Sequence, residues 1–239
     1  MAGASVAVGY SHGAEAIEQV VHAIRDRGGL GCAVQADIGQ EHQVQAMFRQ
    51  VFDNLGGLDL LVYGTESNNR AHLVDMPLRE WDSVLRVNLT GLFLCAREAA
   101  REFIRVGVRA ERSSAAGKIV CITSVHDRIP WSGHAHYTAA MGGVTMLMKT
   151  MAQELAMHKV RVNAIAAGLM RTPANHGLWS SAEREAEALT LIPYGRLGMD
   201  RDVAKAAVWL ASDEADYVTG ATLRIDGGMS LYPGFEKLP

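Results

Sequence analysis

The stretch SVAVGYSHGAEAIEQVVHAIRDRGGLGCAVQ, residues 5–35, sets the fold of this chain. It contains an apolar run at residues 5–10, an amphipathic segment at residues 14–27 and a second apolar run at residues 31–35. Apolar side chains recur every three or four positions in the middle segment, which predicts a helix with one buried stripe that ends at the glycines of DRGG. A strand, a helix and a strand in this order predict two parallel strands joined by a right-handed crossover.

The same alternation of short apolar runs and longer amphipathic stretches continues along the chain. It predicts a parallel sheet with helices on both faces, and therefore an α/β fold. Residues 173–181 are expected to begin a mobile lid over the binding crevice. Further strands are predicted at residues 58–62, 118–123, 160–165 and 222–225, and further helices at residues 40–55, 78–106, 137–157 and 201–211.

Composition limits the classes of partner. A chain of 239 residues with 49% hydrophobic residues can form one large core, which predicts a single domain over residues 1–239. The net charge of -3 comes from charges of both signs spread along the chain, so neither nucleic acid nor an anionic membrane is an expected partner. No apolar run is long enough to span a bilayer, and the three cysteines have no paired or metal-ligand spacing. These features predict a soluble, cytoplasmic protein with reduced thiols.

Several motifs resemble one enzyme family in order and spacing. The motifs are LRVNLTGLFLCAREAA (85–100), GKIVCITSV (117–125), HYTAAMGGV (136–144), VRVNAIAAGLMRT (160–172) and YVTGATLRIDGGM (217–229). Together they resemble the short-chain dehydrogenases/reductases, and IPYGRLG (192–198) and GGMSLYPGF (227–235) are most similar to the glucose 1-dehydrogenase branch. The resemblance implies a Rossmann-like three-layer sandwich, a small-molecule ligand and a homo-oligomer, with a homotetramer as the default expectation.

The N-terminal motif of that family is absent from the expected place. Relatives begin with a central strand and a glycine-rich turn that binds pyrophosphate, whereas this chain matches in frame from the second strand onward. We therefore expect a contracted, mostly parallel six-stranded sheet with strand order 2-1-3-4-5-6, in which residues 5–10 pair with residues 58–62. The alternative interprets AGASVAVG (2–9) as a damaged glycine turn, but no strand precedes Gly3, and Ala7 places a methyl group where the backbone must approach phosphate.

The resemblance assigns three catalytic residues. Tyr137 matches the general acid/base, Ser124 the side chain that holds the substrate oxygen, and Asn88 the support of a proton relay. The lysine that follows the tyrosine by one helical turn in the family is replaced by Met141. A neighbouring cation lowers the pKa of a tyrosine by roughly 1–3 units, and a thioether cannot do so.

The cofactor side departs further from the family pattern. Residues 63–66 read YGTE in place of NNAG, and the carboxylate of Glu66 is expected to repel a pyrophosphate. Ala167 replaces a proline that precedes the threonine contacting the cofactor. Four residues match family positions around the dinucleotide and are interpreted as residual cofactor-binding positions: Asp37, Ile38, Gly168 and Thr172. For Asp37 we favour helix capping as its present role.

The substrate side retains a cluster of aromatic residues near Tyr137. Loops at the carboxyl ends of parallel strands form the binding crevice of such folds, so these residues are expected to line a ligand pocket. The predicted pocket residues are His126, Trp131, His134, His136 and Trp179. No Asp or Glu lies near these histidines at a spacing typical of metal ligands, so no metal site is expected.

These departures lead to a functional expectation. We expect a degenerate homologue that binds no nicotinamide cofactor and has lost hydride transfer, acting as a non-redox enzyme or a silent subunit through the inherited pocket. The alternative is an active sugar or alcohol dehydrogenase that uses NAD or NADP, with Arg128 or a histidine in the role of the lysine. A third possibility is epoxide opening without a nucleotide, as in halohydrin dehalogenases. In any of these enzymes, Tyr137 and Ser124 would carry the acid/base chemistry.

Overall fold

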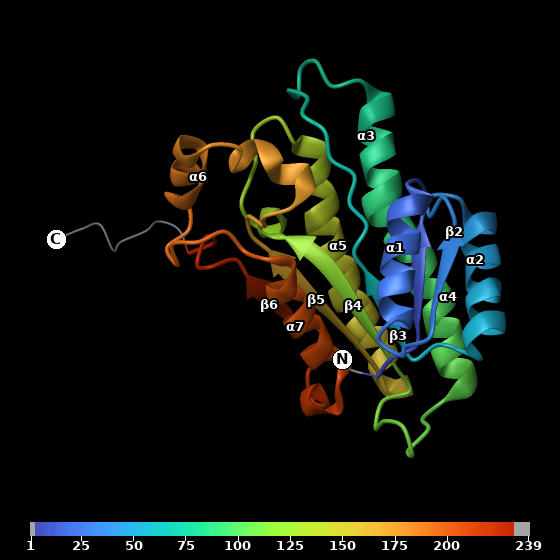
Figure 1. Cartoon of the computed structure of the whole chain (residues 1–239). Helices are drawn as coiled ribbons and strands as arrows, with labels where there is room; N and C mark the ends of the chain where they lie inside the picture. The colour runs from blue at the N-terminus through green and yellow to red at the C-terminus, as the bar shows by residue number, and fades with distance from the viewer. Residues whose placement is uncertain (1–2, 232–239) are drawn as a thin grey trace.

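The computed structural model describes residues 3–231, so residues 232–235 of the last sequence motif lie outside the described part of the chain. Parallel strands are covered by helices on both faces, as predicted for an α/β fold (Figure 1). Helices α4 and α5 pack on one face of the central strands, and α7 packs on the other. Within residues 3–231, no helix is both long enough and apolar enough to cross a membrane.

Strands occur at each of the six predicted segments. They are β1 (Val6–Tyr10), β2 (Gly31–Gln35), β3 (Leu60–Tyr63), β4 (Gly117–Ser124), β5 (Val160–Ala167) and β6 (Thr222–Ile225). The helices are α1 (Ala14–Arg25), α2 (Glu41–Leu55), α3 (Leu78–Leu85), α4 (Gly91–Val106), α5 (Ala135–Leu155), α6 (Ala182–Leu189) and α7 (Asp200–Ala211). Shorter helical segments are η1 (Arg86–Thr90), η2 (Val125–Asp127), η3 (Ala156–His158), η4 (Pro173–Leu178) and η5 (Asp213–Ala215).

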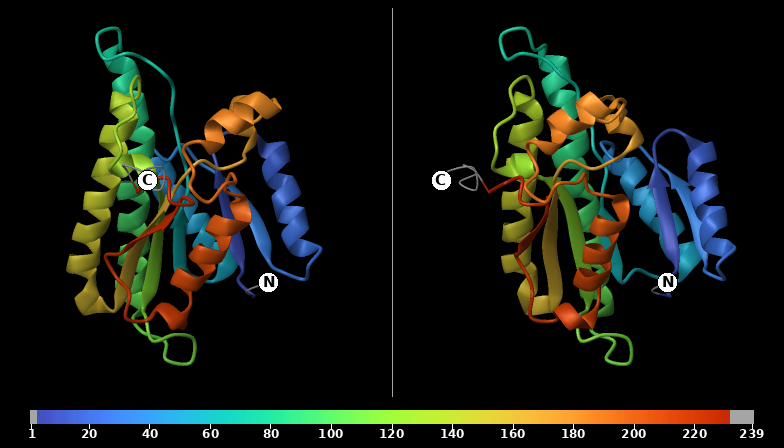
Figure 2. Two further views of the ribbon diagram at one scale, coloured as in Figure 1. Left: turned by 90° about the vertical axis from the view of Figure 1, so that its left-hand side faces the viewer. Right: turned by 60° about the vertical axis from the view of Figure 1, so that its left-hand side comes forward.

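The predicted strand order is wrong at one place. The strands form two parallel groups, β1-β2 and β3-β4-β5-β6, and the expected pairing of β1 with β3 is not formed. Figure 2 shows the β1–β2 pair set to one side of the other four strands. The β1–β2 pair is joined to the other strands through helices, since α2 packs on α4, where Arg97 and Glu41 form an ion pair, and Asp37 pairs with Arg86 at 2.8 Å.

Strands β4 and β5 form the centre of the fold. They pair over their full length, from Gly117 opposite Val160 to Ser124 opposite Ala167. Their side chains are buried on both faces, which explains why both segments are almost continuously apolar. The carboxyl ends of β3, β4 and β5 therefore lie at one edge, where loops can gather functional side chains.

One predicted helix is interrupted in the structure. The segment predicted as a helix over residues 78–106 consists of α3, the π-helical turn η1 and α4. Such π turns insert a residue into the helical ladder and occur frequently at functional sites. Asn88 lies in this turn. Helix α6 was not predicted, because it is short and its sequence is mostly charged residues and alanine.

A pair of glycine substitutions tests the packing. A Cβ at Gly117 would overlap the ring of Phe103, which is fully buried, whereas a Cβ at Gly142 in α5 would meet no atom within 4 Å. Gly117→Ala should lower the free energy of unfolding by about 1–3 kcal/mol through overpacking. Gly142→Ala should raise it by about 0.5–1 kcal/mol, because alanine favours a helix interior. Urea unfolding measures both, and equal stabilities of the two variants would contradict this packing.

Candidate active site

The predicted catalytic hydroxyls lie at the shared edge of the strands. Ser124 is the last residue of β4, and Tyr137 lies in the first turn of α5. The Tyr137 side chain is 3% exposed. Ser124 and Glu66 are the polar side chains that act on its phenol. The structure thus brings Tyr137 and Ser124 together, as the sequence motifs predict.

The environment of the phenol keeps it protonated. Burial raises the pKa of Tyr137 well above its ordinary value, and the negative charge of Glu66 raises it further, while the Ser124 hydroxyl acts in the opposite direction. At the position of the family's lysine, the Met141 side chain is buried, with its sulfur 3.4 Å from the hydroxyl of Thr123. At neutral pH Tyr137 is therefore a proton donor with a carboxylate beside it.

Asn88 fixes the loop that carries Glu66. Its amide nitrogen donates to the carbonyl of Ser67 at 2.7 Å and to that of Val84 at 3.0 Å, and its amide oxygen accepts from the Ser67 N–H at 2.9 Å. Asn88 is almost fully buried, so these bonds are shielded from water. The residue next to Glu66 is thus held at both of its backbone groups.

Three of the predicted pocket residues form one aromatic stack. The Trp131 ring lies 4.6 Å from the ring of His126 and 3.6 Å from that of His134, in near-parallel planes. The edge of this aromatic stack meets Tyr137, whose ring centre lies 6.2 Å from that of Trp131. The Nδ1 atoms of both histidines are paired with backbone carbonyls, which fixes the orientation of the rings.

Two other predicted pocket residues have different surroundings. His136 is 0% exposed, its Nδ1 accepts from the Tyr137 N–H at 2.8 Å, and its Nε2 meets the Oδ1 of Asn69 at 3.0 Å. The expectation that His136 lines the pocket is therefore wrong, because both ring nitrogens are used inside the protein. Trp179 packs against the separate apolar cluster of Ala188, Ile192 and Leu197, next to the Arg171 guanidinium. The structure does not bring Trp179 into the aromatic stack.

The predicted cofactor-binding residues are spread along the strand ends. Asp37 accepts from the Gly39 N–H at 2.9 Å and pairs with Arg86, which lowers the pKa of its carboxyl group. The capping role expected for Asp37 is wrong, because α2 begins at Glu41 with Gln40 as its N-cap and no side chain caps it, so Asp37 stabilises only the turn before the helix. Ile38 lies close to Gly91, and Gly168 packs so closely on Asp226 that a side chain there would clash. Thr172 directly precedes η4.

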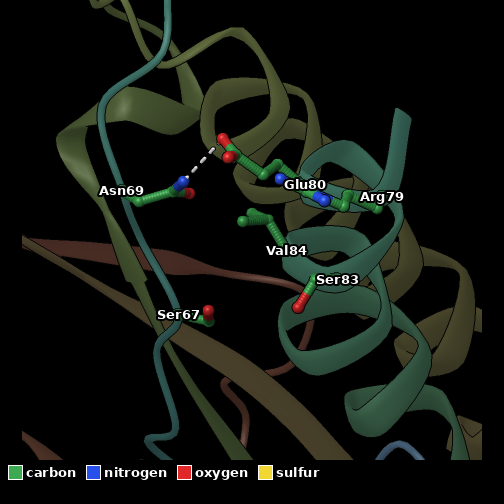
Figure 3. Close-up of a pocket in the computed structure, with 6 residues that line it drawn as sticks. All are labelled: Ser67, Asn69, Arg79, Glu80, Ser83 and Val84. Atoms are coloured by element: carbon green, nitrogen blue, oxygen red, sulfur yellow. Dashed lines mark hydrogen bonds between the residues drawn. The ribbon is translucent and has the colours of Figure 1, made fainter. Parts of the chain in front are cut away.

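A separate cavity lies between the loop after β3 and helix α3 (Figure 3). It has a volume of about 350 Å³, and the Nδ2 of Asn69 donates to Glu80 at 2.9 Å across its upper end. None of the predicted site residues lines it. Its lining residues are Ser67, Asn69, Arg79, Glu80, Ser83 and Val84.

Known proteins resemble the chain over nearly its whole length. A family model described as enoyl-(acyl carrier protein) reductase matches residues 1–230. The 3beta-hydroxysteroid dehydrogenase 1 of Eggerthella lenta is 43% identical, over 98% of this chain and 87% of the relative. Glucose 1-dehydrogenase 2 of Bacillus subtilis is 35% identical, over 96% and 86%. A gluconate 5-dehydrogenase from Burkholderia cenocepacia, in complex with NADP and tartrate, has a TM-score of 0.84 and 30% identity, over 95% of this chain and 86% of that structure.

These relatives correct two expectations drawn from the sequence. The expected loss of hydride transfer is wrong, because relatives covering nearly the whole chain are dehydrogenases. The expected absence of a nicotinamide cofactor is wrong as well, because the matching structure holds NADP. Met141 replaces the family's lysine, but Tyr137 and Ser124 remain where the family has its catalytic hydroxyls.

The hydrogen bonds between Asn88 and the backbone of Ser67 can be tested directly. Asn88→Leu keeps the side-chain volume but removes three hydrogen bonds, so the Ser67 amide should exchange its hydrogen at least about tenfold faster and stability should fall by about 1–3 kcal/mol. Hydrogen-exchange NMR measures the first effect. Asn69→Leu is the matched control, because Asn69 bonds Glu80 and His136 and should leave the Ser67 amide unchanged. Unaltered exchange in Asn88→Leu would contradict this arrangement.

Proposed function

Because the chain belongs to the short-chain dehydrogenase/reductase family, we propose that it is an NAD(P)-dependent oxidoreductase that interconverts a secondary alcohol and its ketone. The observation that carries this proposal is the pairing of the Tyr137 phenol with the Ser124 hydroxyl at the carboxyl end of β4. Two hydroxyl groups in this arrangement can bind one substrate oxygen from two directions.

In this proposal each hydroxyl has its own role. Tyr137 is protonated at neutral pH because its pKa is raised, so it donates a proton to the carbonyl oxygen when a ketone is reduced. Ser124 holds the same oxygen by a hydrogen bond and stabilises the negative charge that develops there. Asn88 acts at a distance by fixing the loop beside the phenol.

A nicotinamide cofactor would supply the hydride donor or acceptor when bound. Residues at the strand ends carry groups that could bind the nicotinamide end and the adenine end of this cofactor. The Thr172 hydroxyl and the Gly168 backbone would hold the nicotinamide end, and Asp37 and Ile38 would hold the adenine end. Between them, Met141 cannot bond the ribose hydroxyls as a lysine does. We expect this difference to weaken cofactor affinity.

The aromatic stack favours a flat, apolar substrate. Trp131 is partly exposed beside Tyr137, and the Nδ1 groups of His126 and His134 are already paired. A ring system with few hydroxyl groups pays little desolvation free energy when it covers such a surface. A sugar, in contrast, needs a hydrogen-bonding partner for each hydroxyl that it buries. Among the relatives' substrates, a 3β-hydroxysteroid fits this wall better than glucose does. The homotetramer and the cytoplasmic location remain predictions.

Removing the phenol oxygen tests the proposed acid/base. Tyr137→Phe should lower kcat/KM with NAD(P) by about 10²–10⁴-fold while the fold persists, because general acid catalysis is lost. The rate is followed through nicotinamide absorbance. Tyr217→Phe is the matched control, because Tyr217 is fully exposed on the surface and should leave the rate unchanged. Equal rates for Tyr137→Phe and the wild type would contradict the assignment.

The substrate preference can be tested at Trp131. Trp131→Ala should raise KM for a 3β-hydroxysteroid by about tenfold or more and change kcat less, because it removes binding surface and no reacting group. Trp209→Ala on α7 is the control, because the two tryptophans are 41% and 42% exposed. Faster turnover of glucose than of the steroid, or an unchanged KM, would contradict a steroid-like substrate.

A further inference from the structure

His136 is a buried histidine at the start of α5, directly before Tyr137, and both of its ring nitrogens are in use. Its Nδ1 accepts from the Tyr137 N–H at 2.8 Å, and its Nε2 lies 3.0 Å from the Oδ1 of Asn69. The side chain is 0% exposed, so these contacts are shielded from water. The histidine thus acts on the backbone of the catalytic tyrosine.

The Tyr137 N–H depends on this contact for its hydrogen bond. The first four N–H groups of a helix have no partner within the helix, and the side chain of the N-cap residue usually supplies one. Here the Nδ1 of the N-cap residue, His134, is paired with the carbonyl of Ser132 instead. The Thr138 N–H, one residue further on, makes a helical bond to the His134 carbonyl at 2.9 Å. His136 therefore supplies the acceptor for the Tyr137 N–H.

The direction of each hydrogen bond around His136 follows from the groups at the two ends. The Tyr137 N–H can only donate, so the Nδ1 of His136 carries no proton. The neutral ring then has its proton on Nε2, which donates to the Oδ1 of Asn69. This leaves the amide nitrogen of Asn69 to donate to the Glu80 carboxylate of α3 at 2.9 Å (Figure 3). Donors and acceptors match at all three contacts.

The fold brings the loop after β3 to the first turn of α5. Besides the bond between Asn69 and His136, the Ala71 N–H donates to the carbonyl of Gly133 at 2.9 Å, so the loop contacts the start of α5 at two points. Hydrogen bonds at both backbone groups of Ser67 fix the same loop to the turn η1. The place of the first turn of α5 is thus set by tertiary contacts as well as by the helix itself.

The two ends of this arrangement differ in burial. The contact between His136 and the Tyr137 N–H is buried, whereas Asn69 is exposed and Glu80 is half-buried. Water can replace the Glu80 carboxylate as the partner of Asn69, but it cannot reach the Nδ1 of His136. The bond that matters most for Tyr137 is therefore the one that Nδ1 accepts.

We propose that His136 is a positioning residue that sets the place of Tyr137 by accepting its backbone N–H, while Asn69 holds the ring. The proposal rests on the function proposed above. A reacting group that is misplaced by about 1 Å can lose about 10²-fold in rate. Because His136 is fully buried and both of its nitrogens are engaged, it offers the substrate no binding surface. Its loss should therefore lower kcat and leave KM nearly unchanged.

The first experiment tests the contact without cofactor or substrate. Nitrogen-15 NMR of the imidazole groups should show His136 with an unprotonated Nδ1 and a protonated Nε2 at neutral pH. Asparagine can place an oxygen where Nδ1 lies, whereas glutamine reaches the Nε2 position. The Tyr137 amide should therefore exchange its hydrogen at least about tenfold faster in His136→Gln than in His136→Asn. A protonated Nδ1 in the wild type, or equal exchange in the two variants, would overturn the contact.

The second experiment compares the same two variants in the reduction of a 3-ketosteroid. His136→Gln should lower kcat by about tenfold or more, with KM within about twofold, and raise the solvent deuterium isotope effect, because proton donation by a displaced phenol limits the rate. His136→Asn should keep kcat within about threefold of the wild type. A merely stabilising role would lower the folded fraction but leave the isotope effect of the folded enzyme unchanged. His22→Gln, at an exposed histidine of α1, is the matched control and should leave both constants unchanged.

The outcomes separate the two proposals. A folded wild-type protein that transfers no hydride to or from any tested alcohol or ketone overturns the proposed function and the positioning role together. A normal wild-type rate with equal kcat and equal isotope effects in His136→Gln and His136→Asn overturns the positioning role alone. A normal wild-type rate with slow turnover and a raised isotope effect in His136→Gln, and near-normal turnover in His136→Asn, supports both.

Discussion

The site depends on one buried amide. Asn88 lies in a π-helical turn between α3 and α4, and from there it bonds both backbone groups of Ser67. This contact joins a helix junction to the loop that leaves β3. The neighbouring Val87 carbonyl accepts from the hydroxyl of Tyr63, the last residue of β3, at 2.5 Å. The π turn is therefore held to β3 and to the loop that follows it, and the loop has little freedom to move.

Local patterns predicted the elements of the fold but not all of their pairings. Strand and helix periodicity placed all six strands, because each depends on a few neighbouring residues. The pairing of β1 with β3 was wrong, because strand pairing depends on contacts between residues far apart in the sequence, such as those of α2 with α4. The π turn at Asn88 was also invisible, because the same residues fit a continuous helix.

In the site, too, local motifs predicted some residues correctly, whereas features that depend on tertiary contacts were not predicted. Motif positions identified Tyr137 and Ser124, and the structure brings their hydroxyls together. His136 was misjudged, because its partners, the Tyr137 N–H and Asn69, become neighbours only in the folded chain. Glu66 was noticed as a departure from the family and interpreted as a group that repels phosphate. Its effect on the pKa of Tyr137 depends on how Asn88 holds the loop at Ser67, which a sequence pattern does not show.

Burial raises the pKa of Tyr137 and keeps its phenol protonated near Ser124, which suits the proposed redox chemistry at an alcohol carbon. The most direct measurement uses a reduced nicotinamide cofactor labelled with deuterium at its transferable hydrogen, incubated with a 3-ketosteroid. The account predicts that mass spectrometry finds the label on the carbinol carbon of the product. A steroid recovered without deuterium, from protein shown to be folded, would contradict it.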